Sequence, residues 1–314
     1  MEVNRANITA LFKAYSAKFN EGFNAPESAG DPDMLRWQDI AMEMPSTTAA
    51  TEHSWIGQLP AMKAWLAERS IQKLNLAGCT VSNRDFEATI GVPVNAIEDD
   101  NFGQFGKLAE AMGNNANAHW AALLEDMILA NPEWADAKPF FASGRVFDLG
   151  SPATTTITNA TTAPFSAAAF SAGLAAIRSW RLRENLSARV MARTLVVGPG
   201  MLEAAKLLVK GDIIGKDGVT VSNVLKGAVN VKYTPAFTGA HANKWFIAGD
   251  VASLKGAVVQ IRKKAKFVAM DAETDEQVFM NKEIRYGCDS RGETFLALPF
   301  TFYMGGLDSV PSAA

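Results

Sequence analysis

The chain of 314 residues has few of the side chains that build most catalytic and metal sites. It contains 3 histidines and 2 cysteines, and none of them stands at the spacing of a zinc or redox motif. Cys79 and Cys288 lie far apart and have no neighbouring histidine, so we expect two free thiols. The sequence therefore indicates neither a disulfide framework nor a zinc site.

A long apolar run and an excess of one charge are also missing. No apolar stretch approaches the roughly 18 residues that a membrane helix needs, and the N-terminus lacks the apolar core of a signal peptide. The formal net charge of -3 at pH 7 argues against a protein whose main task is to coat nucleic acid. We expect a soluble chain made in a cytoplasm, with no membrane partner.

The chain does have a globular composition and two strongly periodic segments. Hydrophobic residues make up 48% of its 314 residues, enough for one large or two medium domains with a real core. Apolar residues recur at helical spacing over residues 7–23 and again over residues 102–131. The second helix would be about 40 Å long at about 1.5 Å per residue, which is longer than most globular helices.

The other segments predict a mixture of strands and helices. Residues 152–250 alternate between helix and strand patterns and predict a compact α/β domain, with a glycine-rich surface loop at residues 212–223. Residues 55–94 predict an extended two-stranded arm. The strand-rich stretch from residue 256 onward is too short for its own core, so we expect it to pair with the region before Gly150.

Three consecutive acids, Glu98, Asp99 and Asp100, form the first candidate for metal or acid–base chemistry. Successive helix residues point about 100° apart, so these carboxylates do not converge on one ligand. Asn95 is a candidate helix cap, with Glu98 three residues later as in a capping box. An alternative register places the cap at Asp99 or Asp100. Both registers favour a structural role at a helix start.

The remaining candidate residues do not have the sequence spacing of known metal, catalytic or phosphate-binding motifs. His53, His119 and His241 have no second metal ligand or triad partner nearby in the sequence. The Gly-Pro-Gly run at residues 198–200 lacks the spacing of a phosphate loop, and its proline removes an N–H donor. We therefore predict no catalytic residue, cofactor site or metal site, and we do not expect an enzyme.

One basic run, at residues 262–267, lies inside an expected strand. Alternation along that strand would place Arg262, Lys264 and Lys266 on one face of a sheet. The pattern favours an ordinary solvated face. The other interpretation is a patch that faces nucleic acid or an acidic neighbour.

Five short motifs follow one another in the first half of the chain. They are Trp-Ile-Gly-Gln-Leu-Pro from Trp55, Lys-x-Trp at Lys63 and Trp65, Arg-x-Ile-Gln from Arg69, Phe-Glu-Ala-Thr-Ile-Gly from Phe86, and Glu-Asp-Asp-Asn from Glu98 leading to Met112-Gly113. Together they resemble the Mu-like phage major head subunit family, called gpT. The resemblance is strong up to Gly113 and weaker toward the C-terminus.

The resemblance implies an α+β chain with the tailed-phage major capsid protein fold. Its parts would be an N-terminal arm (1–54), an extended β-hairpin loop (55–94), a peripheral domain (95–150 plus 251–300) with a spine helix at 102–131, an axial α/β domain (151–250) and a C-terminal tail (301–314).

The implied function is structural. The chain would be a major capsid protein that self-assembles through hexamers and pentamers into the icosahedral head shell of a tailed phage or Mu-like prophage and encloses packaged double-stranded DNA. It would be found in the virion after assembly in the host bacterial cytoplasm. Expected partners are further copies, a portal, cement proteins and, since no scaffold segment precedes the arm, a separate scaffolding protein. The alternatives are an encapsulin-like compartment shell and an α/β enzyme.

Contact candidates follow from this implied scheme. The arm and loop carry apolar segments with little core of their own, so we expect them to be stabilised on neighbouring subunits. Inter-subunit contacts are predicted at Phe12, Tyr15, Trp55, Trp65, Arg69 and Phe86. Arg262, Lys264 and Lys266 would form a basic strip on the inner surface. Deleting residues 62–89 should spare the folded core and abolish assembly.

Overall fold

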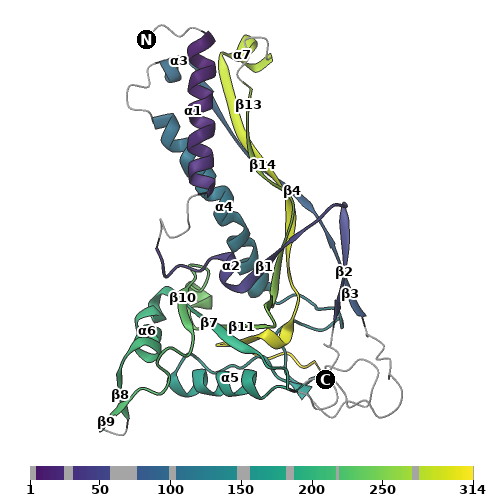
Figure 1. Cartoon of the computed structure of the whole chain (residues 1–314), viewed down its shortest axis with the longest axis vertical. Coiled ribbons are helices and arrows are strands. Elements are labelled where there is room, and N and C mark those ends of the chain that lie inside the picture. Colours follow the sequence, from purple (N-terminus) through teal and green to yellow (C-terminus); the bar gives the residue numbers. More distant parts are fainter. Residues whose placement is uncertain are drawn as a thin grey trace.

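The computed structural model describes residues 5–24, 31–56, 76–98, 104–146, 156–181, 187–216, 219–270 and 276–313. They form an elongated molecule with two parts (Figure 1). In the upper part, which we call the long-sheet module, helices α1 (Arg5–Asn24) and α4 (Gln104–Ala130) lie beside long strands. In the lower part, the mixed-sheet module, helices α5 (Ala167–Ser179) and α6 (Leu202–Lys210) lie beside a second sheet.

The long-sheet module is built on a four-stranded sheet with the order β1-β13-β14-β4. Strands β13 (Ala257–Met270) and β14 (Glu283–Leu296) pair antiparallel, and β4 (Arg84–Pro93) pairs antiparallel with β14. Strand β1 (Ala41–Pro45) pairs parallel with the first residues of β13. The prediction that the C-terminal strands return to the region before Gly150 is therefore confirmed.

Two helices cover one face of this sheet. Helix α4 matches the long helix predicted at residues 102–131. Tyr15 and Phe19 of α1 are 4% and 0% exposed and pack against the rings of Tyr286 and Phe267 in the sheet. The N-terminal helix thus finds an apolar partner in its own chain, so the expectation that it has little core of its own is wrong. Its contact with a neighbouring subunit stays a prediction. The reason is that the strands extend far beyond the mixed-sheet module (Figure 1). There, residues of α1, α4 and the sheet share one apolar cluster.

Glycines allow α1 and α4 to cross closely. A Cβ on Gly113 would collide with the backbone carbonyl of Phe19, and a Cβ on Gly22 would collide with the backbone of α4. Gly106 differs, because a Cβ there would meet only the Tyr15 ring, at 3.7 Å. Glycine lowers the helix propensity of α4 at both positions, but only Gly113 is required by packing.

The two-stranded arm differs from the one that the sequence predicts. Strand β3 (Leu76–Ser82) pairs with β2 (Ala50–Ile56), whereas β4 joins the long sheet. Only Asn83 separates β3 from β4, so side-chain alternation does not reveal that the two strands belong to different sheets. The hairpin therefore starts before residue 55 and ends at Ser82. A deletion of residues 62–89 would also remove part of an edge strand of the long sheet.

The mixed-sheet module has the strand order β10-β7-β11-β12, with β15 on β11. Strand β7 (Met191–Val197) is parallel to β10 (Asn230–Tyr233) and antiparallel to β11 (Trp245–Val251). Helices and strands therefore occur in residues 152–250 as expected, while the bounds of a separate axial domain stay a prediction. The sheet also includes β15 (Phe302–Gly305), which is buried throughout. The predicted C-terminal tail is therefore partly core, because β11 offers it an open edge.

Short elements complete the described chain. They are α2 (Trp37–Ile40), α3 (Val94–Glu98), β5 (Arg145–Val146), β6 (Thr156–Ile157), the hairpin of β8 (Ile213–Lys216) and β9 (Val219–Ser222), β12 (Leu254–Lys255), α7 (Glu276–Asn281) and three 3-10 turns (Pro199–Met201, Gly239–His241, Pro299–Thr301). The β8–β9 hairpin replaces the surface loop predicted at residues 212–223. Asn95 lies inside α3 and does not cap α4, while Asp99 and Asp100 lie outside the described residues.

We predict opposite effects for two Gly→Ala substitutions in α4. Gly113→Ala should lower the free energy of unfolding by about 1–3 kcal/mol, because the methyl group displaces α1. Gly106→Ala should leave it unchanged or raise it by up to about 1 kcal/mol, because space is available and helix propensity improves. Urea unfolding of the unassembled subunit measures both values. Equal effects of the two substitutions would contradict the close crossing.

Candidate functional site

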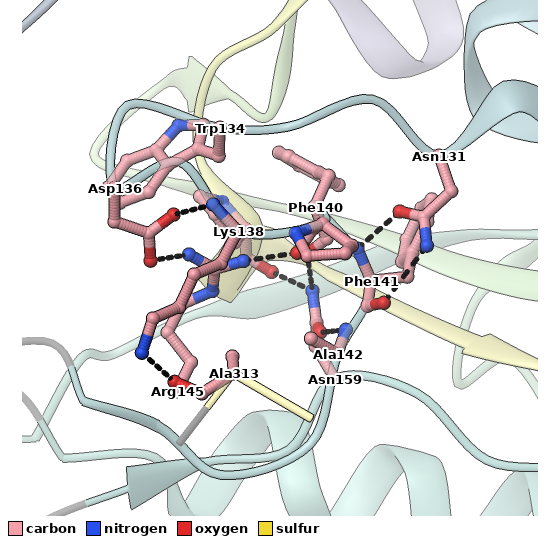
Figure 2. Close-up of polar contacts among 12 residues, drawn as sticks. Asn131, Trp134, Asp136, Lys138, Phe140, Phe141, Ala142, Arg145, Asn159 and Ala313 are labelled. Carbon is pink, nitrogen blue, oxygen red and sulfur yellow. Dashed lines mark hydrogen bonds and ion pairs between the residues drawn. The ribbon is translucent and has the colours of Figure 1, made fainter. Parts of the chain in front are cut away.

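Two asparagines fix the loop that leads from α4 into the mixed-sheet module (Figure 2). The Asn131 side chain accepts a hydrogen bond from the Phe141 N–H at 2.7 Å and donates to the Phe141 carbonyl at 3.0 Å. Asn159 accepts from the Ala142 N–H at 2.9 Å and donates to the Phe140 carbonyl at 3.0 Å. These amides satisfy backbone groups that no sheet or helix satisfies, which a buried loop requires.

Arg145 lies at the centre of the same polar cluster and is 1% exposed. It forms an ion pair with Asp136, donates to the Pro139 carbonyl, and lies over the Trp134 ring at 5.2 Å from its centroid. The Trp134 indole N–H donates to the Ala297 carbonyl at 2.7 Å, which ties the loop to the end of β14. A buried charge is stable only when it is paired, so Arg145 holds the loop in this one conformation.

The C-terminal segment is fixed to this cluster as well. Lys138 donates to the Ala313 carbonyl, and the Ala313 N–H donates to the Ser143 carbonyl at 2.8 Å. Ala313 is 0% exposed. The cluster therefore connects α4, the end of β14 and the C-terminal segment at the junction between the modules, and its chemistry is structural.

The histidines serve packing and hydrogen bonding. His53 is 8% exposed, hydrogen-bonds to Gln260 and packs on the Phe295 ring at 4.8 Å. The His119 ring lies 4.4 Å from the Phe86 ring. His241 is in a 3-10 turn. Across the described ranges, no group of three His, Cys, Asp or Glu side chains is placed to hold a metal ion.

Both thiols are free, as predicted. Burial raises the pKa of the Cys79 and Cys288 thiols, which disfavours the nucleophilic thiolate. Neither cysteine therefore has the environment of a catalytic nucleophile. Within the described part of the chain, no helix combines the length and apolar character that crossing a bilayer requires.

An apolar groove of about 480 Å³ separates α4 from β4. Its lining includes Phe86, Ile90, Leu108, Met112, His119 and Cys288. Leu108 is 41% exposed, although its position on the helix faces this groove. Sequence periodicity places these residues on core faces and gives no sign that the groove is open.

The six predicted contact residues are treated differently by the fold. Tyr15 is buried in the chain's own core, which leaves little of it for another subunit. Phe86 is half-buried against His119 and Trp120. Two further candidates, Phe12 in α1 and Trp55 in β2, have side chains that the structure does not describe. The last two, Trp65 and Arg69, lie outside the described residues. The two residues whose side chains are described, Tyr15 and Phe86, belong to different apolar clusters, and inter-subunit contact stays a prediction for all six.

Arg262, Lys264 and Lys266, the residues of the predicted basic strip, are all exposed, and the expected alternation is interrupted only at Lys263. The pairing of β13 with β14 shifts register on both sides of Lys263, so Arg262, Lys263 and Lys264 are all exposed. Lys264 forms an ion pair with Glu43 at 3.1 Å, and Lys263 forms one with Asp289. The chain's own carboxylates thus neutralise part of the strip, and its orientation toward DNA stays a prediction.

The long sheet with its accompanying helix, the separate β2–β3 hairpin and the mixed-sheet module define the class: this is the fold of tailed-phage capsid proteins. The procapsid protein of bacteriophage JBD30 has this fold, with a TM-score of 0.59 and 24% sequence identity over 98% of this chain and 77% of that chain. The α+β capsid fold implied by the sequence is therefore confirmed.

Family comparisons identify the chain more closely. The family model described as Mu-like prophage major head subunit gpT matches residues 8–164, and the phage capsid protein model matches residues 88–289. The chain belongs to the Mu-like prophage major head subunit family.

Two named relatives agree with this assignment. The major capsid protein of Escherichia phage Mu is 31% identical over 116 residues, which span 37% of this chain and only 36% of the Mu protein. The Mu-like prophage FluMu major head subunit of Haemophilus influenzae is 22% identical over 293 residues, 91% of this chain and 70% of that protein.

We predict that removing one partner of the Arg145–Asp136 ion pair lowers the free energy of unfolding more than replacing both partners with apolar residues. Arg145→Met should lower the free energy of unfolding by about 3–5 kcal/mol, because the Asp136 carboxylate stays buried without its partner. Arg145→Met combined with Asp136→Leu should cost less than the single substitution. Urea unfolding of the three proteins measures the difference, and a double variant that is the least stable of them would refute this reasoning.

We predict a pH effect from His119. Burial lowers its pKa below the usual 6.5; Arg84 lowers it further, and Glu293 raises it. The folded form therefore binds the proton less readily than the unfolded chain, so stability is full above pH 6.5 and falls as the pH drops below that value.

His119→Gln should lose less stability than the wild type between pH 7.5 and pH 5.5, measured by urea unfolding at both values. Burial raises the pKa of Glu125, but Glu125 is present in both proteins and cancels in the comparison. An identical loss in the two proteins would show that His119 does not cause the effect.

Proposed function

We propose that this chain is a major capsid subunit that assembles with copies of itself, through hexamers and pentamers, into an icosahedral head shell around packaged double-stranded DNA. The observation that carries the proposal is the match of nearly the whole chain, 98%, to a procapsid protein fold. The membership of the chain in a major head subunit family supports it.

The elongated architecture suits a shell subunit. A closed shell needs contacts between different surfaces of identical subunits, and such heterologous contacts close into rings. Two modules placed end to end, with a hairpin on the flank, give each subunit several separate surfaces for this purpose (Figure 1).

The base of the β2–β3 hairpin is fixed to the long sheet, which gives the hairpin a defined direction. His53 in β2 hydrogen-bonds to Gln260 in β13, and Gln260 donates to the Asn83 side chain at 2.7 Å. Asn83 in turn donates to the Ser46 hydroxyl at 2.9 Å. Gln260 is 0% exposed, so this network is shielded from water. A hairpin held in this way can present its far end to a neighbouring subunit.

We further propose that the chain carries no catalytic step and that its partners are a portal, cement proteins and a separate scaffolding protein, with assembly in the host cytoplasm. Contact with DNA is loose in this proposal. The net charge of -3 and the partly neutralised strip on β13 support loose contact, because tight binding needs a concentrated basic surface.

Electron microscopy of the purified or co-expressed protein tests the proposal. We expect closed shells or ring-shaped oligomers. A strictly monomeric protein under all assembly conditions would overturn the proposal. Shells that contain a protein cargo instead of DNA would indicate a cellular compartment shell.

A variant with a shortened β2–β3 hairpin tests whether this hairpin is needed for assembly and not for folding. Ile56 and Leu76 face each other across the β2–β3 ladder, so an Asn-Gly turn can replace residues 57–75 without disturbing either strand. We expect this variant to keep the circular dichroism spectrum and unfolding midpoint of the wild type and to form no shells.

The matched control removes a second loop from the mixed-sheet module. Replacing the β8–β9 hairpin, residues 213–222, by a short glycine-serine linker changes a hairpin that lies elsewhere on the molecule. Loss of shells only in the residue 57–75 variant would support a role of that loop in assembly. Normal shells from that variant would contradict it.

A further inference from the structure

Residues 31–45 are bonded to both sheets, and we call this segment the strap. At its start, Met34 forms a parallel bridge with Tyr233 at the open edge of β10. The Leu35 N–H donates to the Tyr233 carbonyl at 2.8 Å, and the Tyr233 N–H donates to the Asp33 carbonyl at 2.8 Å. At its end, the strap becomes β1 of the long sheet. A single short segment therefore crosses the junction between the two modules.

The middle of the strap is anchored in the apolar core. Leu35, Trp37 and Ile40 are 4%, 8% and 2% exposed. Helix α2 begins after Arg36, whose backbone N–H and side chain both bind the Asp39 carboxylate, at 3.1 Å in each case. The strap is thus a defined structural element and not a loose connection.

The charges of the strap are complementary to those of the mixed-sheet module. Asp33 forms an ion pair with Lys206 of α6, and Asp39 forms one with Lys232 of β10 at 3.6 Å. The Tyr233 hydroxyl donates to Asp31 at 3.0 Å. The Lys232 and Asp39 side chains are 13% and 14% exposed, so salt screens this pair less than it screens a surface pair.

The two attachments of the strap differ in kind. On the long sheet, the strap contributes a ladder that extends over all of β1 (Ala41–Pro45). On the mixed sheet, it contributes one isolated bridge, supported by ion pairs and the tyrosine hydrogen bond. Leu35, Trp37 and Ile40 add apolar packing in a buried cluster that also holds Phe237 and Phe246. The backbone pairing with the mixed-sheet module is therefore the shorter of the two, and charged side chains supplement it.

We propose that the strap is an electrostatic latch that sets the angle between the two modules, and that this angle determines the curvature of the shell. The second part rests on the proposed function. Identical subunits that occupy rings of five and six must adopt slightly different shapes, and a charged, partly exposed attachment at the junction is suited to regulate this difference.

Hydrogen exchange of the unassembled full-length subunit tests the latch. Lys206→Asp places a repelling charge opposite Asp33, so the Leu35 and Tyr233 amides should exchange about fivefold faster or more. The amides of the β1–β13 ladder should keep their rates. The charge-swapped protein, Asp33→Lys with Lys206→Asp, should restore slow exchange. Lys206→Gln serves as a milder variant if Lys206→Asp does not fold.

The matched control is Lys226→Asp. Lys226 forms an ion pair with Asp212 in the same module, at side-chain exposures of 58% and 75%. This substitution also repels a nearby aspartate but does not touch the strap, so the Leu35 and Tyr233 amides should keep wild-type rates. Unchanged exchange in Lys206→Asp and Lys206→Gln, or no rescue by the charge swap, would overturn the latch.

Shell diameters test the effect on curvature. Shells of the Lys206→Asp protein should have a broader distribution of diameters in electron micrographs than shells of the wild type, the Lys226→Asp control or the charge-swapped protein. Faster exchange with an unchanged distribution would overturn the link to curvature and leave the latch standing. If the wild-type chain forms no shells, the proposed function and the curvature link both fail, while the exchange rates still decide whether the latch exists.

Discussion

The antiparallel ladder between β13 and β14 is the contact on which the rest of the structure depends. Each strand has 14 residues, and the hairpin reaches well beyond the mixed-sheet module. Near that module both faces of the ladder are buried. Farther away one face needs a separate cover, and α1 and α4 supply it together. The two helices must cross closely to cover this face, so Gly22 and Gly113 are needed where a Cβ would collide with the backbone of the other helix.

The junction between the modules shows how an irregular chain can be held rigidly. The segment after α4 has neither a helix nor a long strand to satisfy its backbone, so the side chains of Asn131 and Asn159 satisfy it. Arg145 adds an enclosed charge with an ionic partner, a carbonyl acceptor and an aromatic face. Such a site tolerates few alternative arrangements, because each of them would leave a polar group unpaired away from water. The conformation of this segment is correspondingly fixed.

Periodicity in the sequence predicts the elements that bury one face against a single layer. Helices α4 and α6 and strand β13 are predicted for this reason, and the short motifs from Trp55 to Gly113 identify the family. Partners and registers are not predicted in the same way. The separation of β3 from β4 depends on one residue, Asn83, and the exposure of Lys263 depends on two register shifts in the ladder. The partner of α1 and the burial of β15 depend on surfaces supplied by distant parts of the chain, which local patterns do not contain.

The direct passage from β3 to β4 has a mechanical consequence. A pull on the hairpin runs through Asn83 and along β4, which is paired with β14 over its 10 residues. The load is then parallel to the strands, so it must shear many hydrogen bonds together and cannot open them one after another. Tension on the hairpin would therefore be resisted by the β4–β14 hydrogen bonds acting together, which is the loading direction in which a sheet resists most.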